Sequence, residues 1–348
     1  DEVYYFCSKH YDYTKSPKIV YLPYFSYNYI RFTPVKIFSY IWSYLHILIM
    51  VATQHPDIIH VQWFKMPHFD FVIYKLIHLL SSAKIIFTAH NILPHNSGTR
   101  YKGIYQKLYN TVDKVVVHTE DTKMKLEQEF HLPPEKVSII RHGVLKMTID
   151  NSRLQSERSH FDSIYNLKGK FVFTSLGEQS MYKGIDVLID VWAQTPELKQ
   201  NSNCRLLIVG KNKGLDFSPL YGINNVIIDN RKISNEEFYY IMCHTDVYLL
   251  PYRVISQSGA MLTALANRIP ILVTEVGGLT DPLKIAPIGW SIPHCDFTSL
   301  QSAMLQLIRQ QHLVQEIKGN QSDWDKVLKH YDWKEISHEM QSLYNTIQ

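Results

Sequence analysis

The chain has 348 residues, of which 45% are hydrophobic and 20% charged; this is an ordinary globular composition, and at roughly 150 residues per domain the length predicts two domains. The four cysteines are far apart and include no CxxC pair, which argues against a zinc ribbon or a disulfide framework and fits a reducing compartment. The net charge of +4 arises from residues 1–145; this mild excess suits an anionic membrane surface or a phosphorylated ligand, and no nucleic-acid motif or partner is indicated.

The first residues resemble the middle of a domain. Val3–Cys7 and Lys18–Leu22 are typical of strands, but no strand, glycine-bearing turn and helix precede them, as a doubly wound domain would require. We therefore expect that a first strand and glycine loop precede Asp1. Pro34–Gln54 predicts one long aromatic-rich helix. Its longest apolar run, Ile37–Ala52, is about 16 residues, too short to span a bilayer, which predicts a buried or interfacial helix.

Four short apolar runs then alternate with helical segments, at residues 57–61, 84–88, 114–118 and 136–140. This alternation predicts a parallel sheet with helices on both faces. A histidine stands at or just after the end of each run: His60, His90, His118 and His142. Strand C-termini line the ligand crevice of such sheets. A structural histidine is the simpler interpretation for any one of them, whereas four together favour a working role for at least one. Their spacing does not predict a metal site.

Residues 145–168 are polar and predict a linker with room for one helical turn. A second series of apolar runs follows at residues 170–177, 205–210, 225–229, 246–251 and 271–274, which predicts a second parallel α/β domain. The closing segment, Lys334–Gln348, has the apolar spacing of an amphipathic helix.

Two loops of this second series carry the chemistry. Ser256–Gly259 is a polar loop that opens a helix after a buried strand, so its free N–H groups and the helix dipole predict an anion site. The alternative is that Ser256 or Ser258 only caps the helix. Lys183 precedes Gly184 at another helix start and could hold a diphosphate; the alternative is an exposed loop lysine. The sequence contains no GxGxxG, which argues against a nicotinamide or flavin enzyme, and no GxxxxGK[ST], the motif of a P-loop.

The order DIIH, FTAHN, VVVHT, IIRHG, SLG…YKGID, LLIVG and PY…SQSG…ALA…P…VGG resembles the retaining, GT-B-fold glycosyltransferases of family 4 over essentially the whole chain. This resemblance implies an α/β fold with two Rossmann-like domains whose parallel sheets face each other across a cleft. Residues 1–145 would be the acceptor-side domain, with helix 334–348 packing back on it, and residues 166–330 would bind a nucleotide-diphosphate sugar. It implies no cofactor, no metal and a glycan or lipid-linked acceptor in polysaccharide assembly. We expect a cytoplasmic protein, or one peripheral to the inner face of the membrane.

The resemblance also implies roles for individual residues. His90 and Lys183 would be catalytic. Donor-binding residues would be Gly177, Lys183, Arg231, Ser256, Gln257, Ser258, Gly259, Ala260 and Thr263. The acceptor side of the cleft would hold His60, Asn91, His118 and His142.

The sequence departs from the family pattern where typical members have two glutamates. Those positions fall near Ser256 and at Thr263 or Ala264, so both carboxylates are missing. Neutral hydroxyls hydrogen-bond more weakly than carboxylates. Glu178 stands where an arginine is common. Two alternatives remain open: a non-catalytic sugar-nucleotide-binding subunit, favoured by the missing glutamates, and a sugar-nucleotide epimerase, which would need clustered carboxylates.

Overall fold

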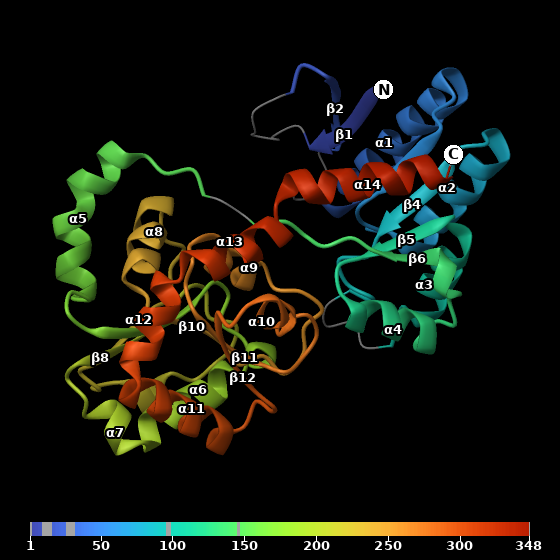
Figure 1. Ribbon diagram of the computed structural model, residues 1–348. Coiled ribbons are helices and arrows are strands. Elements are labelled where there is room, and N and C mark those ends of the chain that lie inside the picture. Colours follow the sequence, from blue (N-terminus) through green and yellow to red (C-terminus); the bar gives the residue numbers. More distant parts are fainter. Residues whose placement is uncertain (1, 9–15, 26–31, 95–98, 145–146, 348) are drawn as a thin grey trace. The chain divides into compact units, whose positions relative to one another are not determined.

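The computed structural model of the chain, traced in Figure 1, describes residues 2–8, 16–25, 32–94, 99–144 and 147–347. The chain divides into two units. The first comprises Asp1–Val116, Leu132–Val137 and Tyr344–Gln348, and the second comprises Val117–His131 and Ser138–Leu343. The domain ranges and the docking of the terminal helix, as expected from the sequence, stay predictions. Residues 145 and 146 of the predicted linker lie outside the described residues.

The N-terminal part of the chain forms two sheets. A parallel pair consists of β1 (Val3–Ser8) and β2 (Ile19–Phe25). The other sheet has the order β3-β4-β5-β6, with β3 at Ile58–Val61, β4 at Lys84–Thr88, β5 at Lys114–Val117 and β6 at Val137–Ile139. The helices are α1 (Thr33–Gln54), α2 (Pro67–Leu80), α3 (Lys102–Thr111) and α4 (Glu120–Glu129). The predicted strands and the long helix are confirmed to within two or three residues.

The second unit contains one six-stranded sheet with the order β12-β11-β10-β7-β8-β9, and all its described pairings are parallel. The strands are β7 (Phe171–Leu176), β8 (Cys204–Val209), β9 (Val226–Asp229), β10 (Val247–Leu250), β11 (Ile271–Thr274) and β12 (Gly289–Ile292). The helices are α5 (Asn151–Tyr165), α6 (Ile185–Gln194), α7 (Pro196–Lys199), α8 (Asn235–His244), α9 (Gly259–Ala266), α10 (Asp281–Ile285), α11 (Phe297–Arg309), α12 (Gln311–Gly319) and α13 (Gln321–His330). The last helix, α14 (Trp333–Ile347), begins in the second unit, and its residues from Tyr344 onward belong to the first.

The inner strands of this sheet contribute side chains to two separate cores. In β10, Val247 and Leu249 belong to one buried cluster, whereas Tyr248 and Leu250 belong to another. Alternate side chains of a strand point to opposite faces, so helices cover both faces of the sheet. Continuous apolar runs such as LLIV in β8 are therefore buried on both sides, as parallel sheets require.

The direction of the chain through the sheet reverses beside β7. From β7 the chain adds β8 and β9 on one side, then returns to place β10 on the other side of β7. The crevice at the carboxyl ends of two such strands is where open α/β sheets bind ligands. The loops that leave β7 and β10 are the two that the sequence singles out.

Two sequence expectations for the second unit are wrong. The predicted linker contains the 15-residue helix α5, because Asp150 caps its first amides and Phe161 and Tyr165 are buried. The strand β12 was not predicted, because its glycine and serine interrupt the apolar run. Its pairing with β11 supplies the stability that local sequence does not.

The helix α1 is longer than its apolar run. It has 22 residues, and its most apolar 18-residue window has a mean hydropathy of 1.6, so by length and composition alone it could cross a membrane. The expectation that no segment is long enough is therefore wrong. Core helices and signal sequences pass the same criterion, so it is weak support for a membrane span.

Candidate functional site

The lysine loop, residues 177–184, connects β7 to α6 in the second unit. It leaves β7 at Gly177 and ends at Gly184, both with positive φ, at 98° and 68°. A Cβ on Gly184 would lie 2.0 Å from the Pro251 carbonyl oxygen and 2.4 Å from Cys295 Sγ. Only glycine therefore lets this loop pass against the end of β10.

The Lys183 side chain is buried, with 9% of the residue exposed. Its Nζ lies 5.7 Å from the centre of the Tyr252 ring. Across the described ranges, no hydrogen bond or ion pair to this ammonium is recorded. Burial lowers the pKa of Lys183, and the Glu178 carboxylate acts in the opposite direction. An unpaired ammonium is costly to desolvate, so this position is suited to an incoming anion. The alternative of an exposed lysine is wrong.

Gln179, which the sequence did not single out, fixes the start of the lysine loop. Its side chain is fully buried and its amide donates to the carbonyl oxygens of Gly177 at 2.9 Å, Ser175 at 3.2 Å and Val209 at 3.2 Å. These bonds satisfy carbonyls at the ends of β7 and β8. A buried glutamine in a polar loop is not distinguishable from an exposed one by sequence alone.

Arg253, also missed from sequence, joins the lysine loop to the chain leaving β10. Its backbone N–H donates to the Tyr182 carbonyl at 2.8 Å. Its guanidinium donates to both oxygens of Asp186 at 2.6 Å, and also to the carbonyl of Met181. A bidentate pair of this kind fixes geometry as well as adding energy. The turn that carries Lys183 is thereby held against the exit of β10.

The serine loop, residues 256–259, opens α9. Ser258 is its N-cap: the hydroxyl accepts from the Met261 N–H at 3.3 Å and donates to the Tyr252 hydroxyl at 3.3 Å. The capping interpretation is therefore right for this side chain. Within the described chain, no acceptor is recorded for the N–H groups of Gly259 and Ala260, and a Cβ on Gly259 would meet nothing within 4 Å. These amides form an open helix N-terminus.

Tyr252 is common to both loops, since its ring lies under the Lys183 ammonium and its hydroxyl meets Ser258. The structure thus brings together one buried cation and the positive end of one helix dipole, a combination that binds anions. The Ser256 carbonyl accepts from the Gly278 N–H at 3.1 Å, which positions the loop. Thr263 uses its hydroxyl on the Gly259 carbonyl at 2.9 Å. Gln257 is half-buried.

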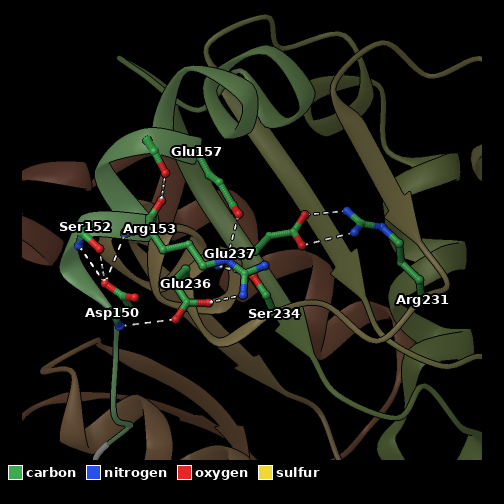
Figure 2. Close-up of polar contacts among 9 residues, drawn as sticks. Asp150, Ser152, Arg153, Glu157, Arg231, Ser234, Glu236 and Glu237 are labelled. Carbon is green, nitrogen blue, oxygen red and sulfur yellow. Dashed lines mark hydrogen bonds and ion pairs between the residues drawn. The ribbon is translucent and has the colours of Figure 1, made fainter.

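Arg231 lies after β9, and its guanidinium donates to the Glu237 carboxylate (Figure 2). It also pairs with Asp229 at 2.9 Å, and these contacts raise the pKa of Arg231. Glu237 is buried, and its N–H donates to the Ser234 hydroxyl at the start of α8. The Arg231 side chain is 53% exposed. A contact between Arg231 and the sugar donor stays a prediction, and it would have to form beside the pairs with Asp229 and Glu237.

His90 lies at the end of β4 in the first unit. Its Nε2 is 3.0 Å from the Gln62 side-chain oxygen, and its ring stacks on Trp63 with centres 4.6 Å apart. Trp63 is about half exposed, and Lys65 Nζ lies 5.2 Å from its ring centre. The imidazole is therefore oriented by neighbours on an accessible aromatic surface. Asn91 follows it and is half-buried.

His60 uses both ring nitrogens inside the first unit. Nδ1 lies 2.6 Å from the Tyr344 hydroxyl and Nε2 lies 2.7 Å from the Thr88 hydroxyl. Burial lowers its pKa to about 4. It is a neutral structural histidine, and neither ring nitrogen remains for a contact with the acceptor substrate.

His118 and His142 contact each other, with ring centres 5.6 Å apart. His118 Nδ1 lies 2.8 Å from the Ile140 carbonyl, and burial lowers its pKa to about 4. His142 Nδ1 lies 2.8 Å from the Gly143 carbonyl, and its ring packs on Trp333. Both side chains have structural partners, and acceptor contacts for them stay predictions.

No group of three or more His, Cys, Asp or Glu side chains within the described ranges could hold a metal ion. Glu178 pairs with Lys213 at 3.3 Å.

Family models match both halves of the chain: one described as Glycosyltransferase Family 4 matches residues 1–144, and one described as Glycosyl transferases group 1 matches residues 170–310. The D-inositol 3-phosphate glycosyltransferase of Corynebacterium efficiens is 26% identical over 219 residues, which is 60% of this chain and 50% of that protein. Its counterpart in Corynebacterium aurimucosum is 23% identical over 247 residues, 66% of this chain and 58% of that protein. The chain thus spans little more than half the length of these relatives.

Solved structures share the fold. Sucrose-phosphate synthase from Thermosynechococcus elongatus aligns with a TM-score of 0.69 and 16% identity, over 98% of this chain and 86% of that one. The Anabaena protein HepE in complex with UDP aligns with a TM-score of 0.67 and 13% identity, over 87% of this chain and 82% of that one. At these identities the likeness shows the fold alone.

Proposed function

Because this chain belongs to glycosyltransferase family 4 and has the GT-B fold, we propose that it moves a sugar from a nucleotide-diphosphate sugar to a polysaccharide or lipid-linked acceptor. The observation that supports this most is the buried, unpaired ammonium of Lys183 beside the open N-terminus of α9, at the reversal point of a parallel sheet. Both groups are positive and have no anionic partner among the described residues, and a diphosphate would supply the negative charge.

We assign the donor to the second unit. The Lys183 ammonium and the N–H groups of Gly259 and Ala260 would bind the diphosphate oxygens, as helix N-termini commonly do. The Anabaena protein of the same fold is described in complexes with UDP and with UDP-glucose, and a donor of this chemical class suits these loops.

The bond that breaks joins the anomeric carbon to the diphosphate. Negative charge grows on the leaving phosphate, and preorganised cations and amides stabilise such charge in the transition state. The acceptor hydroxyl would attack from the same face and pass its proton to the leaving phosphate, with retention of configuration and without a metal ion. His90 would hydrogen-bond the transferring sugar or the acceptor hydroxyl, since each imidazole nitrogen can donate or accept.

A second candidate is a non-catalytic subunit that binds sugar nucleotides. The observation that favours it is the neutral character of Ser256 and Thr263, where typical family members carry carboxylates. The Thr263 hydroxyl is also committed to the Gly259 carbonyl. Binding without turnover would follow if these carboxylates are essential.

A donor-turnover assay separates the two candidates. The purified chain is incubated with UDP-, GDP- and ADP-sugars, with and without EDTA, and release of the nucleoside diphosphate is measured. We expect release from one class of donor, insensitive to EDTA and strongly reduced in Lys183→Ala. Tight donor binding with no release would support the non-catalytic subunit. Activity lost in EDTA and restored by Mg²⁺ or Mn²⁺ would contradict the metal-independent reaction.

We place this chemistry in the cytoplasm. All four cysteines lie within the described ranges and are free thiols, as expected in a reducing compartment.

A further inference from the structure

The middle of helix α1 directs three hydroxyl-bearing side chains into the first unit, whereas Thr53 and Gln54 at its end are exposed. Tyr40, Ser43 and Tyr44 are buried on its inner side. Their hydroxyls lie 2.8 Å from Asp70, 2.9 Å from the Tyr24 carbonyl and 2.9 Å from the Tyr74 hydroxyl, respectively. An ordinary surface helix has the reverse arrangement, with polar residues facing solvent.

The outer side of α1 is a row of large apolar residues. We call it the α1 stripe; it consists of Val35, Phe38, Trp42, Leu45 and Ile49, which are 44–64% exposed. Their alternating spacing of three and four residues places them on one helix face. Ile37 and Ile41 flank the row and are also exposed. Single exposed hydrophobic residues are normal, but a contiguous row of this size marks an interaction surface.

The inner contacts decide how α1 can meet a membrane. Asp70 is fully buried, and its carboxylate accepts from Tyr40 and from the Met66 N–H. Moving α1 across a bilayer would break these bonds and leave buried polar groups without partners, which is costly. The helix therefore stays on its unit and can offer only its outer side.

The charged side chains of α1 and α2 that reach solvent are lysines. α1 carries one charged residue, Lys36, and the neighbouring α2 carries Lys75 and the buried Asp70. Both helices are wholly described, and neither has an exposed carboxylate. α2 adds a second row of exposed apolar residues at helical spacing, Val72, Leu76 and Leu79.

This surface suits lipid better than protein. Protein–protein interfaces have a polar rim and about one hydrogen bond per 100–200 Å², whereas the α1 stripe has no hydrogen-bonding side chain except the Trp42 indole. Apolar and aromatic residues with lysines at the margin are typical of helices that lie in the interface of an anionic bilayer. We propose that the α1 stripe is a membrane-docking surface that seats the first unit on an anionic lipid bilayer, with α1 parallel to the membrane plane.

Vesicle co-sedimentation of the full chain tests this directly. The vesicles are phosphatidylcholine with phosphatidylglycerol at about one third of the lipid, and pure phosphatidylcholine vesicles serve for comparison. Trp42→Glu should lower the partition coefficient by about tenfold or more, since it replaces an aromatic side chain that would insert into the bilayer by a charged one. Ile49→Glu should do the same. Both side chains are more than half exposed, so the melting temperature should not fall.

The matched control is Tyr221→Glu in the second unit, an aromatic residue that is 69% exposed. It makes the same kind of change away from the α1 stripe and should leave vesicle binding unaltered. Lys36→Gln and Lys75→Gln should each weaken binding to the anionic vesicles by about fivefold and leave binding to neutral vesicles unchanged.

Two results would overturn the proposal. One is a wild-type chain that stays in the supernatant and does not bind the vesicles. If sedimentation velocity then shows a dimer that Trp42→Glu dissociates, the α1 stripe is a contact with a second copy of the chain. The other is equal loss of vesicle binding in Trp42→Glu and Tyr221→Glu. Donor binding is measured separately on the same variants, so failure of the proposed function would not affect this outcome.

Discussion

Lys183 is held in a position that costs the unliganded protein stability. Its pKa is lowered by burial, so the folded state disfavours the ammonium relative to the unfolded chain. Stability therefore rises with pH as the solution passes from below the lowered folded pKa up to the ordinary lysine pKa. Donor binding, in contrast, needs the charged ammonium form of Lys183, because the diphosphate is an anion.

We expect Lys183→Met to separate stability from binding. Methionine fills a similar volume without a charge, so the melting temperature without ligand should rise by a few degrees; about 1 kcal/mol corresponds to roughly 2–4 °C for a unit of this size. Affinity for the nucleotide sugar should fall about ten- to a hundredfold through loss of a charge-assisted contact. Thermal unfolding and calorimetric titration measure the two effects. A variant that is less stable and binds normally would show that the lysine is a structural group.

His90 should affect turnover and not stability. Its ring is oriented by Gln62 and Trp63 on an accessible surface, so His90→Ala should leave the melting temperature nearly unchanged and reduce kcat by about 100-fold or more. His160→Ala, at an exposed histidine of α5, is the control and should change neither quantity. Near-normal turnover in a well-folded His90→Ala chain would remove this residue from the mechanism.

The sequence predicted the positions of Lys183 and Ser258 but not their surroundings. A lysine before a glycine at a helix start looks the same whether it is exposed or buried against Tyr252. Gln179 and Arg253 were missed because their partners, Val209 and Asp186, are distant in sequence or carry no motif. Roles that depend on contacts between separate loops are not encoded in local pattern.

At the scale of elements, the lysine loop packs against the end of β10 at Gly184. Gly184→Ala should cost about 2–5 kcal/mol, the sum of a left-handed conformation and a clash with the Pro251 carbonyl. It should also abolish donor binding, because the turn carrying Lys183 must move. Urea unfolding and donor titration are the measurements.

Gly169→Ala is the matched control for that substitution. Gly169 has φ of +72°, close to the +68° of Gly184, but a Cβ there would meet nothing within 4 Å. It should cost only about 1–2 kcal/mol and leave donor binding intact. Equal losses in the two variants would show that backbone conformation alone, and not the close approach to β10, accounts for the effect.

Strands with continuous apolar runs were predicted well, and β4 and β11 have the expected bounds. Elements stabilised by distant contacts were not. α5 looks like a polar linker because only Phe161 and Tyr165 near its end are buried, with Leu154 packed against the same core. α1 was predicted as a helix, but periodicity does not show that its hydroxyls face inward and its apolar residues outward.

For the whole molecule, two half-buried histidines predict sensitivity to acid. The pKa of His60 and that of His118 are lowered by burial to about 4, below the value near 6.5 of an unfolded chain. Their contribution to stability is therefore complete above about pH 6.5 and is lost as the pH falls through 4.

We expect the free energy of unfolding to decrease between pH 7 and pH 5, and to decrease less in His60→Gln. A glutamine amide can still reach the hydroxyls of Thr88 and Tyr344 but does not titrate. Urea unfolding at both pH values provides the comparison. An unchanged pH dependence in the variant would show that His60 is not a source of acid sensitivity.

The alternation of strands and helices predicted two parallel α/β regions, but the strand order could not be predicted. The return of the chain from β9 to β10 beside β7 is what brings the two loops together, and no local signal marks it. The alternation of strands and helices predicted only the α/β class, and the family resemblance predicted the GT-B fold.

The central claim is that the second unit binds a nucleotide-diphosphate sugar through Lys183 and the start of α9. The most direct measurement is thermal unfolding of the wild-type chain and of Lys183→Ala in the presence of UDP-, GDP- and ADP-sugars. A ligand at about 100 times its dissociation constant stabilises the folded state by about 2.7 kcal/mol. We predict a rise in melting temperature with one nucleotide class in the wild type, and a much smaller rise in Lys183→Ala. No shift with any donor, or equal shifts in the two proteins, would contradict this assignment.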